Sequence, residues 1–324
     1  MRFSDIIGHD QIVARLKRVA AAGRLPHTYL FAGPDGVGKH TTARALAARL
    51  LCEAPRDDDA CGACGGCAAV AREVHPDLVM VRIEEGASEI KIDQARELQR
   101  RLRLRPIRAG YKVAILDDAH RLNLAAQHAM LKTFEEPPGS AVLILVASNV
   151  AALLPTVLSR CQRVSFFPLS SEIVARLLTE RCDVPAGEAT ELARYSEGSL
   201  SHAVLFRSEL IERARAELLP LIRDLRHRPY ADLADLAQDW ARLPSVDLVL
   251  LLRAPLQWYR QCMTEALGAV EAGNAPTLLS QIRVVHDTIE HLRHNAHRQL
   301  ALDGMLIELQ RLEGLLAPEA PGNG

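Results

Sequence analysis

Short apolar runs alternate with amphipathic stretches through the first half of the chain. The apolar runs predict strands at 28–33, 77–82, 111–118, 141–148 and 163–167. Apolar residues at helical spacing predict helices between them, at 39–51, 92–104 and 123–136. Because continuous apolar strands alternate with helices, the pattern predicts an α/β fold whose parallel sheet is covered on both faces.

After Pro168 the strand pattern stops and only helical spacing continues. Helices are predicted at 171–181, 187–196 and 200–216, followed by longer amphipathic helices up to residue 316. A chain of 324 residues is long enough for two or three domains. We therefore expect an α/β domain at 1–167, a small helical domain at 168–208, an all-helical domain at 209–316 and a disordered tail at 317–324.

The overall charge of the chain argues against strong binding of nucleic acid by the isolated protein. A formal net charge of -1 gives no strong general attraction for nucleic acid, so any such contact needs a local patch. The first residues, MRFSDIIGHD, contain no apolar run of the kind found in signal peptides, and no stretch is apolar enough to span a membrane. We expect a cytoplasmic protein without membrane partners, whose seven cysteines are poor candidates for disulfides.

The stretch GPDGVGKH at 33–40 differs at its last residue from a phosphate-binding loop. It follows a predicted buried strand and opens a helix, so its backbone amides and the helix dipole would favour an anion, while the Lys would reach the terminal phosphates. The motif requires Ser or Thr as the next residue, because a hydroxyl there ligates Mg²⁺, and an imidazole is a poor ligand for that ion. The candidate nucleotide-binding residues here are Gly33, Gly36, Gly38, Lys39, His40 and Thr41.

An acidic pair ends the third predicted strand, in VAILDDAH at 113–120. Ligands of parallel sheets lie beyond the carboxyl ends of the strands, so Asp117 is suited to the water shell of a metal ion. Asp118 stands where ATPases with such loops commonly carry Glu, and its side chain is shorter by about 1.5 Å, which weakens a general base. The sequence leaves open whether the loop binds ATP and Mg²⁺ or is kept for packing alone, and it argues against efficient hydrolysis.

Four cysteines with the spacing C-x8-C-x2-C-x2-C predict a metal site. Four thiolates suit tetrahedral Zn²⁺, and glycines between them permit the tight turns that such a loop needs. Alternatives are an iron–sulfur cluster, a redox dithiol or no bound group. The set has no open position for catalysis, so we expect a structural zinc site at Cys52, Cys61, Cys64 and Cys67.

The order of these features resembles that of the bacterial clamp-loader subunits of the AAA+ class. The cysteines fall between the helix of the phosphate loop and the second strand, LNLAAQHAMLKTFEEPP (122–138) follows the acidic strand, and LSRCQRV (158–164) precedes the fifth strand. The resemblance is specific over about 1–205 and rests only on helical character beyond. It implies that the helical domain at 168–208 is a lid and that 209–316 forms an oligomerisation collar.

Within that family the motor subunits, gamma and tau, carry a complete phosphate loop, an acidic pair with Glu, and an Arg in a G-S-x-R-D-A stretch. Here GSLSHA (198–203) has Ser201 in place of the Arg. Three residues, His40, Asp118 and Ser201, thus differ from those of the motor subunits. The resemblance therefore implies a non-motor subunit with little or no catalysis of its own. Ser148 or Asn149 would hold the polar position at the end of the fourth strand.

The Ser-Arg-Cys motif at 159–161 matches the family fully. In the family its Arg acts in trans on the ATP held by a neighbouring motor subunit, so the resemblance implies that Arg160 is an arginine finger. The alternative is that Arg160 pairs with a carboxylate on its own surface. The implied assembly is a hetero-oligomer with gamma/tau and delta subunits, which loads the sliding clamp onto primed DNA as part of a DNA polymerase holoenzyme.

Two other functions stay open at this point. One is an active AAA+ motor ATPase, against which the three departures count. The other is a zinc-dependent DNA-binding module with a vestigial phosphate loop, against which the near-neutral charge counts. The six arginines of 96–108 could contact DNA phosphates, although such a run more often forms a solvated or subunit-facing surface.

Overall fold

The computed structural model describes residues 1–108, 110–205, 214–268, 275–293 and 296–314. The chain divides into two compact units. The first comprises Met1–Ala193 and Glu197–Ser201, and the second comprises Arg194–Ser196 and His202–Gly324. Each unit is described by itself below.

The first unit is built on a five-stranded parallel sheet with the order β2-β3-β4-β1-β5. Its strands are β1 (Thr28–Ala32), β2 (Leu78–Val81), β3 (Lys112–Leu116), β4 (Ala141–Ala147) and β5 (Gln162–Ser165). The predicted parallel α/β fold is therefore confirmed, with every predicted strand present. Because all strands run the same way, their carboxyl ends meet at one edge of the sheet, where ligands of such folds bind.

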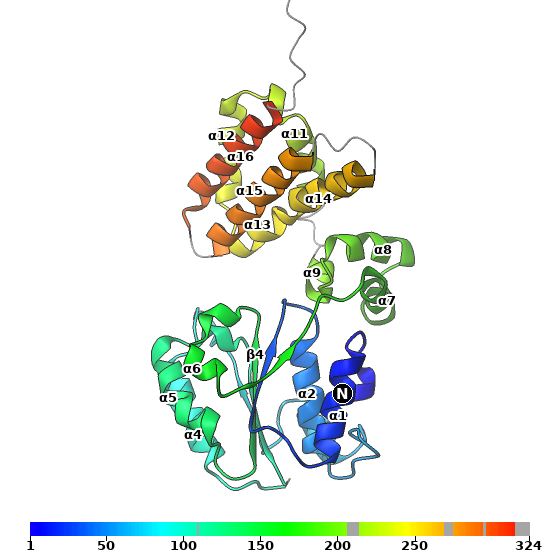
Figure 1. Cartoon of the computed structure of the whole chain (residues 1–324), viewed down its shortest axis with the longest axis vertical. Coiled ribbons are helices and arrows are strands. Elements are labelled where there is room, and N and C mark those ends of the chain that lie inside the picture. The colour runs from blue at the N-terminus through cyan, green and yellow to red at the C-terminus, as the bar shows by residue number, and fades with distance from the viewer. Residues whose placement is uncertain (109, 206–213, 269–274, 294–295, 315–324) are drawn as a thin grey trace, which may run out of the picture. The chain divides into compact units, whose positions relative to one another are not determined.

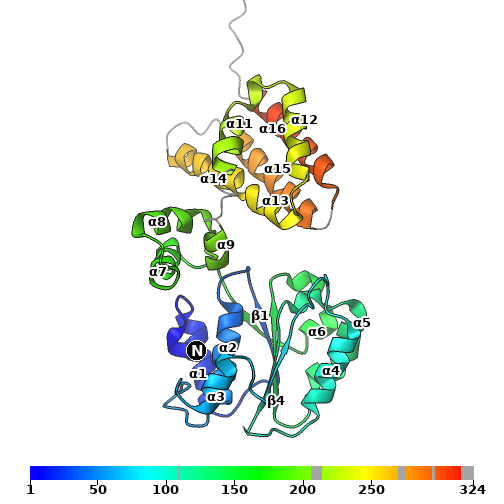
Figure 2. The ribbon, with the colours of Figure 1, turned by 180° about the vertical axis from the view of Figure 1, so that it is seen from behind.

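Helices cover both faces of this sheet, as Figures 1 and 2 show from opposite sides. On one face, α1 (Asp10–Ala21), α2 (Lys39–Leu50) and α3 (Gly65–Ala71) pack on alternate strand residues such as Phe31 and Ile144. On the other face, α4 (Ile92–Leu102), α5 (Leu124–Glu135) and α6 (Pro155–Leu158) pack on the intervening residues, such as Leu30 and Leu143. Burial of both faces explains why the strands read as continuous apolar runs.

Three short 3₁₀ turns complete the α/β part, at Phe3–Asp5, Ala119–Arg121 and Val150–Ala152. Helices α2, α4 and α5 confirm the helices predicted at 39–51, 92–104 and 123–136. The sequence pattern did not predict α3. Its seven residues, GGCAAVA, begin with two glycines, which are unfavourable in a helix, and they lie within the stretch that was interpreted as a cysteine loop. Its N-cap is Cys64, whose sulfur accepts a hydrogen bond from the backbone N–H of Cys67.

The helices after the sheet are α7 (Ser171–Cys182), α8 (Ala186–Tyr195) and α9 (Leu200–Leu205). The predicted helix 200–216 is described only as far as Leu205 and again from Ala214, since 206–213 lie outside the described residues. Most of this segment groups with the sheet in the first unit. The division into domains at 167 and 208 stays a prediction.

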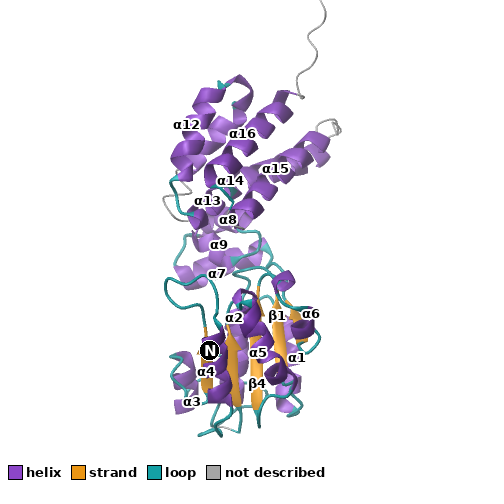
Figure 3. Cartoon of the chain, turned by 90° about the vertical axis from the view of Figure 1, so that its left-hand side faces the viewer, coloured by secondary structure: helices purple, strands orange, loops and turns teal. Residues whose placement is uncertain are grey.

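All described elements of the second unit after residue 214 are helices, drawn in purple in Figure 3. They follow a π-helical turn at Ala214–Leu218 and pack around a core that includes Trp240 and Tyr259. A 3₁₀ turn lies at Leu225–His227 between the first two of these helices, which are α11 (Leu219–Arg223), α12 (Tyr230–Ala241), α13 (Ser245–Leu251), α14 (Arg253–Gly268), α15 (Ala275–Arg293) and α16 (Arg298–Gly314). The predicted tail at 317–324 lies outside the described residues, and no described helix is long and apolar enough to cross a membrane.

Candidate nucleotide site and cysteine cluster

The phosphate-loop residues and the acidic pair meet at the carboxyl edge of the sheet. Gly33 follows β1, Asp117 follows β3 and Ser148 follows β4. Strand β4 pairs with β1 on one side and with β3 on the other, so it sets the spacing between the loop and the acidic pair. The structure thus brings the predicted nucleotide-binding residues together.

The ammonium group of Lys39 is held by the loop itself. Its Nζ donates hydrogen bonds to the carbonyl oxygens of Gly33, at 2.7 Å, and Pro34, at 2.6 Å, and it lies 3.7 Å from Asp35. The side chain is only 5% exposed, and this burial lowers the pKa of Lys39, although the Asp35 carboxylate opposes the shift. To reach a phosphate, Lys39 must exchange two backbone acceptors for the ligand.

His40 faces the first carboxylate of the acidic pair. Its Nε2 lies 3.7 Å from Oδ2 of Asp117 and is buried without a hydrogen-bond partner among the described residues. Burial lowers the pKa of His40, and the Asp117 carboxylate opposes this. The imidazole therefore stands between the helix and Asp117, in the region where the hydroxyl of a complete phosphate loop would ligate Mg²⁺.

Charged side chains of α2 and of the segments around β2 lie beside His40. Glu73 pairs with Arg82 at 2.7 Å and with Arg44 at 3.5 Å. The hydrogen bond from Arg82 lowers the pKa of Glu73, so the carboxylate stays ionised. The positive charges of Arg44 and Arg82 also help to lower the pKa of His40, which keeps the imidazole neutral near pH 7.

The second carboxylate, Asp118, is more exposed than Asp117, although neighbouring groups still cover part of it. Burial raises the pKa of Asp118, and the neighbouring Asp117 carboxylate adds to the shift. Nε2 of His120 lies 3.4 Å from Oγ of Ser148, while the Asn149 side chain accepts the backbone N–H of Ala151. Ser148 thus contacts the residue two positions after Asp118, whereas Asn149 caps a local turn. Which of them holds the polar position at the end of β4 stays a prediction.

Two glycines of the loop are closely packed against other segments. A Cβ on Gly33 would lie 2.4 Å from the carbonyl oxygen of Phe166, and a Cβ on Gly36 would lie 2.2 Å from Oγ of Ser199. The backbone N–H of Leu200 also donates to the carbonyl of Gly36 at 3.0 Å. The GSLS segment (198–201) therefore lies directly on the phosphate loop.

A small cavity lies beside the loop. A cavity of about 60 Å³ is lined by Gly36, Val37, Gly38 and Thr41 from the loop and α2, and by the N-terminal residues 5–7 and His9. Nε2 of His9 contacts the carbonyl of Val37 at 2.7 Å. Thr41 consequently faces this cavity, whereas His40 faces Asp117.

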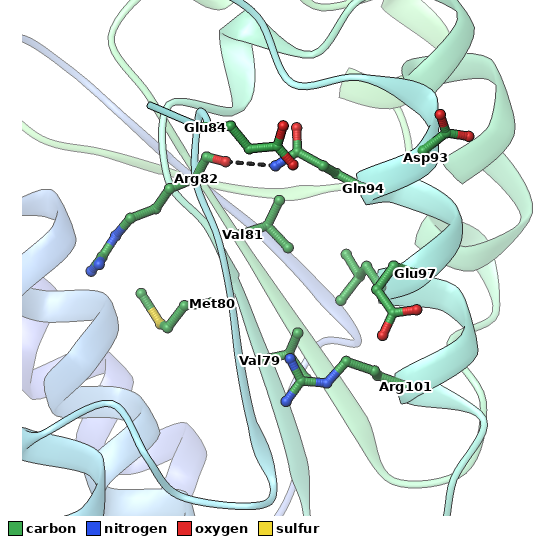
Figure 4. A pocket seen from close by; sticks show the side chains of 10 residues that line it. Val79, Met80, Val81, Arg82, Glu84, Asp93, Gln94, Glu97 and Arg101 are labelled. Carbon is green, nitrogen blue, oxygen red and sulfur yellow. Dashed lines mark hydrogen bonds between the residues drawn. The ribbon is translucent and has the colours of Figure 1, made fainter. Parts of the chain in front are cut away.

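A larger cavity of about 390 Å³ lies between β2 and α4, away from the predicted site (Figure 4). Val79 and Val81 of the strand and Leu98 of the helix line it, and the Gln94 side chain closes one end by donating to the carbonyl of Arg82 at 2.8 Å. β2 is the outermost strand of the sheet, so this cavity flanks its free edge. None of the predicted site residues lines it.

The arginine run at 96–108 begins on α4. Arg96 lies 3.6 Å from Asp93 and Arg100 lies 2.7 Å from Glu97, both within the helix. These exposed pairs neutralise part of the run locally, as expected for a solvated helix face. Contact between the run and DNA stays a prediction.

The four cysteines converge although they come from a loop and from α3. Their ligand atoms all lie within 4.8 Å of one another, with 3.9 Å between the sulfurs of Cys52 and Cys64 and 3.9 Å between those of Cys61 and Cys67. Four sulfurs at about 2.3 Å from a tetrahedral zinc ion lie about 3.8 Å apart, so the set fits such an ion. Backbone N–H groups of Ala63 and Cys64 lower the pKa of Cys61 to about 6, which favours the thiolate that a metal needs.

The loop that carries the cysteines (residues 52–67, called the cysteine loop below) also holds the N-terminus of the chain. The Asp59 carboxylate accepts the backbone N–H groups of Phe3 and Ser4, each at 2.9 Å, and of Ala60 at 2.7 Å. On the other side, the Arg181 guanidinium of α7 donates to the carbonyl of Asp5 at 2.5 Å. The N-terminal turn is therefore fixed between the cysteine loop and α7.

Arg160 is one-third exposed and pairs within its own chain. Its Nε donates to Oε2 of Glu135 at 2.9 Å, and its Nη1 donates to the carbonyl of Thr156 at 3.0 Å. The alternative that the sequence left open, a carboxylate partner on the same surface, is thus present in the isolated chain. It does not decide the finger role, which stays a prediction.

Three contributors to these sites were missed by the sequence interpretation. Glu135, Asp59 and Ser199 act through tertiary contacts with residues 25, 56 and 163 positions away in sequence. Asp59 lies in the run Asp57-Asp58-Asp59, and nothing in the sequence distinguishes it from its neighbours. Signals were available for the other two, since Glu135 belongs to the FEEPP stretch and Ser199 to the GSLSHA stretch that entered the family resemblance, but neither stretch indicates the contact that its residue makes.

The chain is similar in sequence to known subunits of DNA polymerase III. A family model described as "DNA polymerase III, delta subunit" matches residues 8–170. The DNA polymerase III subunit delta' of Pseudomonas aeruginosa is 31% identical over 308 residues, which cover 89% of this chain and 93% of that protein. The subunit tau of Bacillus subtilis is 30% identical over 215 residues, or 65% of this chain and 38% of tau. A solved structure of a gamma subunit-related protein from Thermotoga maritima aligns with a TM-score of 0.44 and 17% identity, covering 94% of this chain and 100% of that one.

Proposed function

The chain belongs to the family of DNA polymerase III delta' subunits, and we propose that it is the non-motor subunit of a clamp loader in DNA replication. The match to subunit tau is confined to about a third of that protein's length, whereas the match to delta' covers nearly all of both chains. A clamp-loader role therefore follows from relatives of both kinds, and the delta' assignment follows from the extent of the match.

The contact between His40 and Asp117 carries the non-motor assignment. The imidazole lies 3.7 Å from the carboxylate that would hold the water shell of Mg²⁺, in a loop whose Lys39 is bound to backbone carbonyls. Without a hydroxyl ligand the metal is poorly held, and phosphoryl transfer depends on that metal to neutralise developing charge. Asp118 and Ser201 also replace residues that the motor subunits carry for ATP hydrolysis. This chain therefore hydrolyses ATP poorly or not at all.

The catalytic contribution of the chain is made to a neighbour. Arg160 would act in trans on ATP held by a gamma/tau subunit, where a guanidinium stabilises charge on the transferring phosphoryl group. Support comes from its place in the Ser-Arg-Cys motif and from its partial exposure. The assembly would be a hetero-oligomer that also contains delta, acts on the sliding clamp and primed DNA, and belongs to a nucleotidyltransferase holoenzyme.

The cysteine cluster would hold one structural zinc ion. Its four sulfurs have the mutual distances of a tetrahedral site, and thiolate sets of this kind suit Zn²⁺. When bound, the ion cross-links the loop to α3. All four thiolates would be ligands, so the site supplies stability rather than chemistry.

The test is DNA-stimulated ATP hydrolysis by a loader reconstituted with this chain. We expect Arg160→Ala to lower the rate by about tenfold or more, because arginine fingers contribute several orders of magnitude at their own site. Lys39→Ala in this chain should leave the rate within about twofold. Arg163→Ala, an exposed arginine three residues away, is the matched control for loss of a surface charge. A loss with Lys39→Ala, together with turnover by the isolated chain, would identify a motor subunit instead.

A further inference from the structure

Arg160 lies two residues after the end of α6 (Pro155–Leu158), and the segment around α6 is attached to α5 on both sides of this helix. Near the start, the buried Gln127 side chain accepts the backbone N–H of Leu154 at 2.8 Å and donates to the carbonyl of Ala152 at 3.1 Å. At the end, Glu135 accepts Nε–H of Arg160. Gln127 and Glu135 lie at opposite ends of α5, so this one helix fixes the whole segment that carries Arg160.

The backbone around Arg160 is held independently of its side chain. Its N–H donates to the carbonyl of Val157 at 3.1 Å, and Ser159 N–H donates to the carbonyl of Pro155 at 3.0 Å. These bonds fix the Cα of Arg160 but leave the rotations of its long side chain. The contacts with Glu135 and Thr156 are what restrict those rotations.

The hydrogen bonds of the guanidinium use only part of its donors. Nε serves Glu135, and Nη1 serves the Thr156 carbonyl and lies 3.5 Å from Oγ of Ser159. Nη2 donates to no group in the part of the chain that the structure describes. A guanidinium carries five N–H donors in a rigid plane, so holding Nε and Nη1 also fixes the direction of the Nη2 donors.

We propose that Glu135 is the positioning residue for Arg160, holding its guanidinium so that Nη2 is presented outward to the phosphates bound by the neighbouring subunit. This inference rests on the proposed role of Arg160 as a finger in trans. A side chain that is oriented before assembly loses less rotational freedom when it meets its target, which favours the productive arrangement.

The charge of Glu135 could in principle oppose this role, because a carboxylate reduces the positive potential of its partner. The side chain of Glu135 is 57% exposed, so water screens that charge, while the hydrogen bond keeps its geometric effect. Orientation requires only an acceptor at this position, whereas restraint by charge requires a carboxylate. Glu135→Gln, which keeps an acceptor oxygen and removes the charge, separates the two effects.

The experiment measures DNA-stimulated ATP turnover in a reconstituted loader with Glu135→Ala, Glu135→Gln and Arg160→Ala in this chain. We expect Glu135→Ala to lower kcat about threefold to tenfold with little change in KM for ATP, because the finger acts in the transition state. Glu135→Gln should restore most of the loss. Glu136→Ala is the matched control, since Glu136 is exposed, adjacent in sequence and forms no ion pair among the described residues.

Each outcome bears on the inference. A kcat loss with Glu135→Ala that Glu135→Gln restores supports positioning, provided that the variants enter the complex normally by size-exclusion chromatography. Wild-type rates with Glu135→Ala, alongside a defect with Arg160→Ala, overturn the positioning role and leave the finger intact. Faster turnover with both Glu135 variants shows that the carboxylate restrains Arg160. A normal rate with Arg160→Ala removes the finger role and the positioning role together.

Discussion

The contact between the phosphate loop and the GSLS segment predicts a sharp difference between two glycine substitutions. Gly36 has φ +71°, and an added Cβ would lie 2.2 Å from Oγ of Ser199 and 2.8 Å from Cβ of Ser201. Gly86 has a similar φ of +78°, and an added Cβ there would have no atom within 4 Å. Gly36→Ala therefore combines backbone strain with overlap, whereas Gly86→Ala has the strain alone.

The two contributions can be estimated separately. A left-handed conformation costs a residue with a Cβ about 1–2 kcal/mol relative to glycine. Overpacking a closely packed site adds about 1–3 kcal/mol, because side chains and backbone must shift. We expect Gly36→Ala to lower the free energy of unfolding of the first unit by about 2–5 kcal/mol and Gly86→Ala by about 1–2 kcal/mol.

The assay must report on the first unit alone. Both tryptophans, Trp240 and Trp258, lie in the second unit, so fluorescence would follow the wrong part of the chain. Hydrogen exchange of the amides of β1 and β4 reports the free energy of opening of the central sheet. Tryptophan fluorescence in urea then serves as an internal control, and its midpoint should be unchanged in both variants.

An equal loss of protection in the two glycine variants would refute this reasoning. If Gly36→Ala and Gly86→Ala lower the protection of β1 and β4 by the same amount, within about 0.5 kcal/mol, then the contact with Ser199 and Ser201 imposes no constraint. A second check is local. Gly36→Ala should also speed exchange of the Leu200 amide, which donates to the carbonyl of Gly36 in the native chain.

Three further predictions concern the cysteine loop and a buried histidine. Asp59→Ala should speed exchange of the Phe3 and Ser4 amides, while Asp58→Ala, whose carboxylate pairs with Lys17 instead, should not. Verified removal of metal by a chelator should increase proteolysis of the cysteine loop and leave tryptophan fluorescence of the second unit unchanged; an unaltered digestion pattern would contradict this. Burial lowers the pKa of His75 below 6.5, so the unfolded chain binds more protons and stability should fall as the pH drops through 6.5. His75→Gln should reduce that slope in thermal melts, and the exposed His128→Gln should not.

The fold could be predicted from the sequence because burial on both faces leaves a strong local signal. Strand β4, AVLILVA, is buried at every position, and its short length and its β-branched residues favour a covered parallel strand over a buried helix. The order of the strands could not be predicted in the same way. The position of β1 between β4 and β5 results from packing between segments that are more than 100 residues apart.

In the candidate sites, too, features set by spacing along the chain could be predicted, whereas contacts between distant segments could not. Ligand spacing along the chain was enough to assemble the cysteine cluster, because three of its members lie within seven residues. The partner of Arg160 was not predictable, since Glu135 reaches it only after α5 and α6 have packed together. Likewise, the position of the Lys39 ammonium depends on the carbonyl directions of the folded loop, which no residue pattern encodes.

The glycines of the phosphate loop are required for packing, whether or not the loop binds a nucleotide. Gly33 is required because a Cβ would meet the carbonyl of Phe166, and Gly36 because a Cβ would meet Ser199. Both requirements come from the protein itself and would hold if no phosphate ever entered the site. The residues whose side chains bear on nucleotide binding are therefore Lys39 and His40. A bound nucleotide would have to replace the bonds of Lys39 to backbone carbonyls and would meet His40 beside Asp117.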